Sequence, residues 1–137
     1  MNAWSLNGTG LLALLLAGCA SLASPACPDG ARPVVSDQLY FGTGKPDGGV
    51  VSAAEWSGFL RDVVTPRFPS GFTTWQAAGQ WRDARGSIDH EAAYVVSLVH
   101  PGDDGAEQAV RAIVADYKAR FAQEAVLRVS GAGCASY

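Results

Sequence analysis

The sequence has few of the residues that build common catalytic and metal sites. Its 137 residues include two histidines and three cysteines, and no HExxH, GxSxG, CxxC or EF-hand pattern occurs in it. His90 and His100 fall at the two ends of one predicted strand, about 33 Å apart at the usual rise per residue. They cannot share a metal ion, and we interpret both as strand-end surface residues. We therefore expect neither a metal site nor a cofactor.

Positive charge is scarce as well. Ten Lys and Arg residues stand against thirteen Asp and Glu residues, the formal net charge is −3, and the basic residues are scattered. Nucleic-acid binding needs a clustered basic surface, so we expect no nucleic-acid partner. The glycine-rich stretch around Lys45 lacks the leading glycine of a phosphate-binding loop, and Pro46 follows the lysine. We interpret this stretch as a turn.

The chain also lacks an apolar run long enough to span a bilayer, which takes roughly 20 residues. Residues 1–18 carry no charged side chain and end in LLALLLAG, which has the length of a signal-peptide core. The LAGC tetrapeptide at 16–19 resembles the lipobox of bacterial lipoproteins. That resemblance implies removal of residues 1–18, a lipid on Cys19 and a position facing the periplasm. In a cell with two membranes, Ala20 after the cysteine favours the outer membrane. The alternative is a buried hydrophobic helix.

The cysteine number favours export independently of the leader. If Cys19 carries the lipid, Cys27 and Cys134 remain, and an even remainder outside the cytoplasm favours a disulfide. The alternative is two free thiols in the terminal segments. Residues 19–37 are dominated by Pro, Ala, Ser and Gly, which predicts a flexible tether behind the lipidated cysteine. Residues 38–134 then form a single domain.

Four segments have the composition and alternation of strands. Residues 37–42 alternate and are aromatic, and residues 73–83 (TTWQAAGQWRD) alternate strictly. Residues 90–100 are rich in β-branched side chains and pair naturally with 73–83 as a hairpin. Residues 124–130 form the last predicted strand.

Two helices separate these strands. Ser52 and Glu55 form a capping box that begins the first helix, and Pro66 ends it. Asp104 and Glu107 take the cap and N3 positions of the second helix. The order is βαββαβ, which is the ferredoxin-like α+β fold. Right-handed crossovers place both helices on one face of a four-stranded antiparallel sheet.

The opposite sheet face is left open, and strand parity predicts which residues it carries. We assign Trp75 and Trp81 to the helix side because they are large and apolar. Leu127 and Val129 are assigned to the helix side for the same reason. The residues then predicted on the open face are Tyr40, Gln76, Gln80, Arg82, Glu91 and Arg128.

Three interpretations of this mixed face remain. Two copies of the chain, or one copy and an envelope protein, bind through it. It lines a pocket for a small anionic or polar molecule, with Arg82 and Arg128 as anchors. It is an ordinary solvated sheet face. An enzyme that uses Tyr40 or Glu91 as acid or base is a further alternative.

Three strings together resemble one known family. LYFGTGKPDGG, VTPRFPSGFTTWQAAGQWRD and YKARFAQEAVLRV are similar to a bacterial family of unknown function, domain of unknown function 3574, which includes many lipoproteins. The resemblance covers residues 39–129 and implies no activity. Within these strings, the polar residues that no predicted structural role explains are candidates for a functional surface. These are Lys45, Arg67, Gln80, Arg82, Arg120 and Glu124.

We expect a lipid-anchored protein of the cell envelope whose ferredoxin-like domain acts by binding a protein or a small molecule. The expected partners are the membrane, through the anchor, and a second copy or an envelope protein. The alternative is a small cofactor-free enzyme, dimeric in some forms of this fold, with a pocket on the open face.

Overall fold

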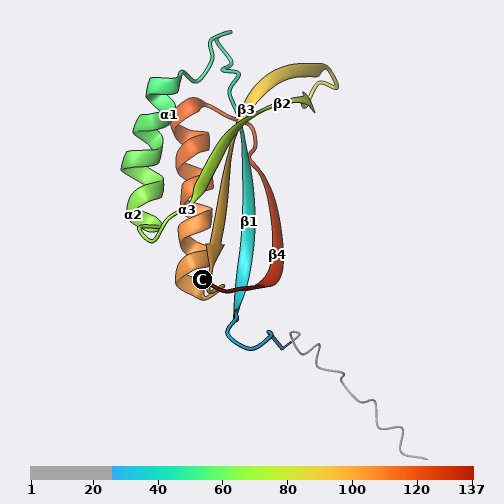
Figure 1. Ribbon diagram of the computed structural model, residues 1–137. Helices are drawn as coiled ribbons and strands as arrows, with labels where there is room; N and C mark the ends of the chain where they lie inside the picture. Colours follow the sequence, from blue (N-terminus) through green and yellow to red (C-terminus); the bar gives the residue numbers. More distant parts are fainter. Residues whose placement is uncertain (1–25) are drawn as a thin grey trace, which may run out of the picture.

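Figure 1 shows the computed structural model, in which residues 26–137 are described. The predicted signal peptide and Cys19 lie outside the described residues. The elements are β1 (Arg32–Gly42), α1 (Ala53–Phe59), η1 (Leu60–Val64), α2 (Thr65–Arg67), β2 (Thr73–Arg82), β3 (Ile88–His100), α3 (Asp104–Phe121) and β4 (Leu127–Ala135).

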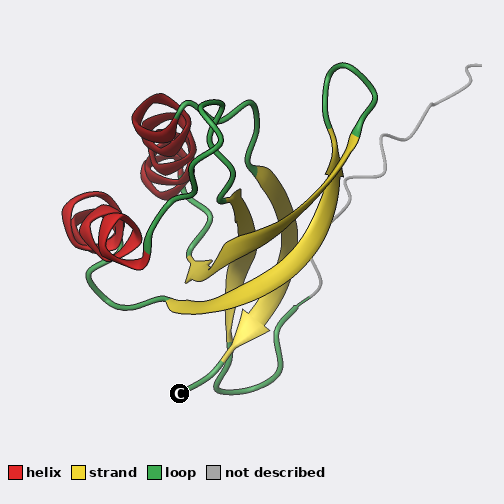
Figure 2. Cartoon of the chain, turned by 90° about the horizontal axis from the view of Figure 1, so that it is seen from above, coloured by secondary structure: helices red, strands yellow, loops and turns green. Residues whose placement is uncertain are grey.

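The predicted α+β fold and its βαββαβ order are confirmed. The four strands form one sheet in the order β2-β3-β1-β4, and every neighbouring pair is antiparallel. The helices lie together on one side of the sheet, and its other side is uncovered (Figure 2). Within residues 26–137, no helix has the length and apolar character needed to cross a membrane.

β1 begins earlier than the sequence predicted. It starts at Arg32, inside the segment expected to be a flexible tether through Asp37. The reason is its partner: β4 continues to Ala135, beyond the predicted end at Ser130, and Arg32 pairs with Ala135. The longer β4 supplies a hydrogen-bonded neighbour for the first residues of β1, which composition alone does not reveal.

The first helix begins as predicted. Ser52 Oγ accepts a hydrogen bond from the Glu55 amide, and a Glu55 carboxylate oxygen accepts one from the Ser52 amide. The helix continues through the π-helical turn η1 and ends at Arg67, one residue beyond the predicted stop at Pro66. Proline has no amide hydrogen, and a wider turn just before it leaves room for its ring.

The cap of α3 differs by one residue from the prediction. Asp103, not Asp104, is the N-cap, and its carboxylate accepts a hydrogen bond from the Ala106 amide at 2.8 Å. Glu107 therefore does not serve as the N3 residue of a capping box. Its carboxylate instead binds arginines, as described below.

Aromatic side chains fill the space between the sheet and the helices. Phe41 of β1 packs against Trp56, Phe59 and Tyr117 from the helices, at centroid distances of 4.6–5.9 Å. Tyr94 of β3 stacks on Trp56 at 4.5 Å. Burial raises the pKa of the Tyr117 hydroxyl, which donates to the Gly42 carbonyl oxygen at 2.9 Å. This core fixes the helices on one face and leaves the other face free.

The predicted disulfide is present. Cys27 and Cys134 are bonded, with their Cα atoms 5.6 Å apart. The bond joins the segment before β1 to β4, next to the pair of Pro33 with Cys134. Both ends of the described chain are thereby held at the same end of the sheet.

Candidate functional site

The pairing register determines which side chains share the uncovered side of the sheet. Opposed residues of an antiparallel pair point to the same face. Trp75 pairs with Val95, Val95 with Tyr40, and Tyr40 with Leu127, so these four residues form one row across all four strands. We call it the central row. Its sequence neighbours on β1 and β3, such as Leu39 and Val96, are buried in the helix-side core.

We use the name open face for the side that carries the central row. Its large apolar residues are Val34, Tyr40, Trp75, Trp81, Val95, Val99, Leu127 and Val129.

The predicted facing of β2 is wrong. Trp75 and Trp81 lie on the open face, while Gln76, Gln80 and Arg82 point to the side on which the helices lie. The physical reason is the length of the hairpin, which extends beyond the helices (Figure 1). Past the helices this side of β2 meets water, so it accepts polar side chains without a helix to cover them. Arg82 donates to the Gly86 carbonyl oxygen within this hairpin.

The predicted facing of β4 is also wrong. Leu127 and Val129 lie on the open face, and Arg128 points toward α3. The reason is a pair of carboxylates, one on Asp37 of β1 and one on Glu107 of α3, that bind the Arg128 guanidinium on the helix side. These carboxylates compensate the charge of Arg128 on the helix side of the sheet, where the sequence predicted apolar side chains of β4.

The open face is consequently apolar rather than mixed. Of eight exposed large hydrophobic residues in the described chain, five lie on it: Trp75, Trp81, Val99, Leu127 and Val129. Their exposed fractions run from 41% for Trp75 to 51% for Val129. Val95, between Trp75 and Tyr40 in the central row, is fully covered by its neighbours. Exposed apolar side chains gathered on one side of a small domain are typical of an interaction surface.

Two predicted residues do lie on the open face. Tyr40 is half-buried, and its hydroxyl donates to Gln38 at 2.7 Å. A Glu91 carboxylate oxygen accepts a hydrogen bond from the Gly44 amide at 2.8 Å. A Cβ at Gly42 would stand 2.6 Å from the other Glu91 oxygen, so the carboxylate lies directly over this glycine. Glu91 is thus a fixed carboxylate beside the apolar residues.

The remaining candidates are dispersed. Lys45 pairs with Glu55 at 2.8 Å, Arg67 with Asp116 at 2.9 Å and Arg120 with Asp62 at 3.9 Å. These pairs join turns and helices away from the open face. Glu124 is exposed in the connection between α3 and β4. The structure therefore does not bring the family-derived candidates together at one place.

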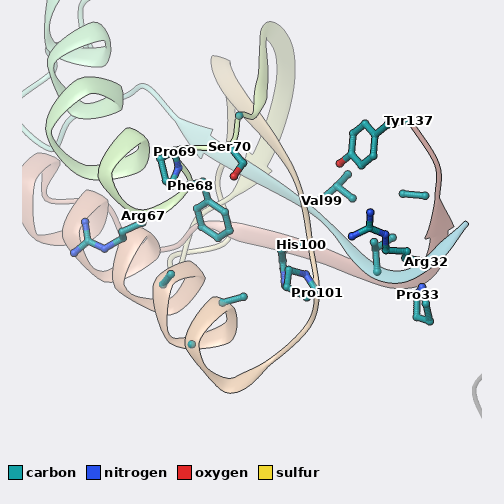
Figure 3. Close-up of a pocket in the computed structure, with 16 residues that line it drawn as sticks. Arg32, Pro33, Arg67, Phe68, Pro69, Ser70, Val99, His100, Pro101 and Tyr137 are labelled. Atoms are coloured by element: carbon teal, nitrogen blue, oxygen red, sulfur yellow. The ribbon is translucent and has the colours of Figure 1, made fainter.

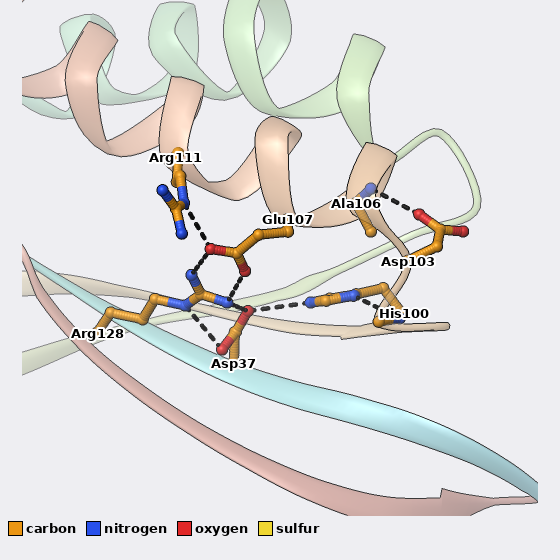
Figure 4. A network of polar contacts seen from close by, with 8 residues as sticks. Asp37, His100, Asp103, Ala106, Glu107, Arg111 and Arg128 are labelled. Carbon is orange, nitrogen blue, oxygen red and sulfur yellow. Dashed lines mark hydrogen bonds and ion pairs between the residues drawn. The ribbon is translucent and has the colours of Figure 1, made fainter.

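A polar cluster on the helix side brings together residues that sequence reasoning did not select (Figure 4). Arg128 binds Asp37 at 2.7 and 3.0 Å and Glu107 at 2.7 and 3.0 Å. Burial alone would raise the pKa of Asp37, but hydrogen bonds from Arg128 and His100 outweigh it and lower that pKa. Arg128 and Arg111 lower the pKa of Glu107 to about 2.

His100 is a buried member of this cluster, which corrects its interpretation as a surface residue. Its Nδ1 accepts a hydrogen bond from the Gly102 amide at 3.1 Å, so the proton resides on Nε2 and is donated to Asp37 at 3.0 Å. Both ring nitrogens are engaged, and neither is free to take a proton from a substrate in this arrangement. The cluster as it stands joins β1, β3, β4 and α3, and does not form a poised acid–base pair.

One signal in the sequence could have located the cluster. Asp37 lies two and four positions before Leu39 and Phe41, so alternation puts its carboxylate on the core side. A fully buried carboxylate needs a cationic partner, which points to an arginine facing the same side of a neighbouring strand. That argument would have turned Arg128 inward and Leu127 and Val129 outward.

A cavity of about 530 Å³ lies at the end of the sheet where β1 begins and β4 ends (Figure 3). Phe68, His100 and Pro101 line it, together with Arg32 of β1 and the terminal Tyr137. Arg67, although it borders the cavity, directs its guanidinium away to Asp116. Within residues 26–137, no group of three His, Cys, Asp or Glu residues is arranged to hold a metal ion.

Over residues 36–137 the chain matches a family described as "Protein of unknown function (DUF3574)". The chain belongs to this family. The match runs from within β1 to the C-terminus, so the central row and the polar cluster both lie within the region that defines DUF3574. Among curated proteins, no sequence matches this DUF3574 protein.

Two solved structures share the fold of this DUF3574 protein. One is a phage SAM lyase in complex with S-methyl-5'-thioadenosine, with a TM-score of 0.58 and 14% identity. That match covers 85% of this chain and 97% of the lyase chain. The other is a phage SAM lyase in the apo state, with a TM-score of 0.57, 12% identity and coverage of 84% and 97%. At this identity the likeness is one of fold.

Proposed function

We propose that this protein is a cell-envelope lipoprotein, anchored through Cys19, whose folded domain acts by binding through the open face. The observation that carries the proposal is the concentration of exposed Trp75, Trp81, Leu127 and Val129 on that face. Water-soluble domains rarely leave such a surface uncovered without an interaction partner. The Cys27–Cys134 disulfide supports an oxidising compartment, which agrees with export.

Carbene footprinting in intact envelopes tests the binding function. The labelling yield of peptides that contain Trp75 or Leu127 is divided by the yield of the peptide that contains Val50. If the open face is covered by a partner, this ratio should be several-fold lower than the ratio of the exposed fractions of these residues. Val50 is 64% exposed and lies outside the open face, so it serves as the internal control. Full labelling of Trp75 and Leu127 in the envelope would contradict binding through this face.

Metabolic labelling tests the anchor. An alkyne-tagged fatty acid should label the wild-type chain and not the Cys19→Ala variant, and only the wild type should sediment with membranes. A wild-type chain that carries no label would refute the anchor while leaving the binding function open to its own test.

A second candidate is a small enzyme or binder with an adenosyl-sulfur ligand on the open face. The fold likeness to two SAM lyase structures over most of both chains favours it. Glu91 supplies a fixed carboxylate for a sugar hydroxyl, and Trp75 offers a ring for stacking. Calorimetric titration with SAM and with S-methyl-5'-thioadenosine tests it. Binding that Glu91→Gln weakens at least tenfold supports this candidate, and no heat with either ligand refutes it.

A further inference from the structure

A second cavity lies on the helix side of the sheet, away from the open face. It has a volume of about 300 Å³ and runs between α3 and the first residues of β4, and we call it the α3–β4 groove. Five residues of α3 line it, together with Val126 and Arg128. Because β4 is an edge strand, no further strand of the described chain closes its outer side.

We propose that the α3–β4 groove binds an amphipathic anion, namely a carboxylate joined to a single saturated chain of about eight carbons. The groove is a site separate from the open face. Its test is therefore independent of the binding function proposed for that face.

The floor of the groove is apolar. Val110 and Val114 stand about one helical turn apart on α3, and Val126 lies across the groove from them. Val110 is fully buried, while Val114 and Val126 are partly buried and pack against the core. Their methyl groups give a surface that favours a saturated chain and offers a polar chain no hydrogen bond.

The volume of the groove determines the length of that chain. A water molecule takes up about 30 Å³ in the liquid and a methylene group is of similar size, so about ten such groups fill 300 Å³. An eight-carbon carboxylate has about this number of non-hydrogen atoms. A lipid with two long chains is several times too large.

The rim of the groove is basic. Arg111, Lys118 and Arg128 line it, which is three of the ten Lys and Arg residues in a chain of formal net charge −3. Two carboxylates, those of Asp37 and Glu107, are bound to these cations (Figure 4). One positive charge is left over at the groove, and it favours an anionic head group on the ligand.

Two of the cations have donors to offer an anion. Within residues 26–137, Lys118 takes part in no ion pair. Arg111 donates from its Nε to Glu107 at 2.7 Å, and this is the hydrogen bond that its guanidinium makes in the described part of the chain. The terminal amino groups of Arg111 and the ammonium group of Lys118 can therefore donate to a carboxylate.

A small residue separates these two cations. Arg111, Ala115 and Lys118 stand at positions i, i+4 and i+7 of α3, so they share one face of the helix. Arg111 and Lys118 are about 10 Å apart along the helix axis at the usual rise per residue. Ala115 between them is exposed, and its short side chain leaves an opening in the rim. A carboxylate in this opening is within reach of both long side chains, while its chain lies on the valines.

Photoaffinity labelling of the full chain tests the proposal. The probe is an eight-carbon carboxylate with a diazirine and an alkyne near the end of its chain, added to a lysate that contains the tagged full chain. Trypsin cleaves after Arg111, Lys118, Arg120 and Arg128, so adducts at the floor fall in peptides 112–118 and 121–128. We expect light-dependent label in these two peptides, which unmodified octanoate removes and acetate does not.

A matched pair of variants tests the position of the head group. Ala115→Glu places a carboxylate in the opening of the rim, and Ala119→Glu places the same charge one turn further along α3, outside the groove. Both alanines are exposed and glutamate is a good helix former, so both variants should fold, which circular dichroism checks. Like-charge repulsion should lower the labelling of the two peptides roughly tenfold or more in Ala115→Glu, and less than about twofold in Ala119→Glu. Equal labelling in the two folded variants would overturn the proposal.

Two further probes test the chemistry of the ligand. The matching eight-carbon alcohol should label the two peptides several-fold less than the acid, and equal labelling by both would overturn the anion. A phosphatidylglycerol with a diazirine in its chain should not label them, and labelling as strong as that of the acid would overturn the single-chain ligand in favour of a lipid surface. Label from the acid that falls outside both peptides would overturn the site and leave the binding function of the open face standing.

Discussion

Asp37 is fully buried, and its stability as a carboxylate depends on Arg128 and His100. The side chain of Arg128 is one-quarter exposed, whereas that of Asp37 is fully buried. Removal of one member of such a pair leaves a buried charge without compensation, which costs far more than the pair itself contributes.

We predict that Arg128→Leu lowers the free energy of unfolding by about 3 kcal/mol. Arg111→Leu is the matched control, because Arg111 binds the same Glu107 but its side chain is three-quarters exposed. That control should change stability by less than about 0.5 kcal/mol. Urea unfolding monitored by fluorescence measures both, and equal losses in the two variants would contradict the argument.

At the scale of elements, β4 and α3 are held together by the contact of Arg128 with Glu107, and β1 joins them through Asp37. The pKa of Glu107 is about 2 instead of 4.5, because Arg128 and Arg111 stabilise its ionised form. The pKa of Glu55 is likewise lowered to about 2, by Lys45 and by Ser52.

Stability should therefore fall in acid within a defined window. The unfolded chain takes up protons at these glutamates near pH 4.5, whereas the folded chain does so only near pH 2. The stabilisation is complete above pH 4.5 and is lost as the pH falls toward 2. Urea midpoints between pH 7 and pH 2 measure this loss, which Glu107→Gln should reduce. Both side chains are partly exposed, so 0.5 M salt should weaken the effect, and a midpoint independent of pH would contradict it.

The elements themselves were predictable because their signals are local. The capping box at Ser52, the alternation of 73–83 and the β-branched third strand each specify an element from neighbouring residues. The facing of β2 and β4 was not predictable in the same way. Trp75 and Arg128 take their sides from strand register and from helices that stop short of the hairpin, and both are tertiary facts.

The candidate site was predictable only in part for the same reason. Tyr40 was assigned to the correct face because Leu39 and Phe41 mark the buried side of β1. Glu91 was placed by alternation alone, since β3 is apolar on both sides. The apolar character of that face was missed, since the rule that large apolar residues point inward fails where a sheet has an interaction surface on its second side. Asp37 and His100 were missed because their partners are 91 and 63 positions away in the chain.

At the scale of the whole molecule, the Cys27–Cys134 bond closes a loop with a sequence separation of 107 residues. Constraint of so long a loop in the unfolded chain contributes about 4–5 kcal/mol in the chain-entropy model. The double variant Cys27→Ser and Cys134→Ser should lose most of this amount in urea unfolding, and reduction of the wild type should match it. A loss below about 1 kcal/mol would show that the terminal strands are held by their ladders alone.

The position of that bond also determines how the domain responds to tension. β1 lies inside the sheet, flanked by β3 and β4, and the chain enters it from the Cys27 side. A pull on the N-terminal segment is divided at Cys27 between β1 and, through the sulfur bridge, β4. Both strands are then loaded in the same direction along their length, so the ladder between β1 and β3, which joins this pair to the rest of the sheet, must shear rather than open one bond at a time. The turn end of the β2–β3 hairpin lies beyond the ladder between β1 and β3 and carries little of this force (Figure 1).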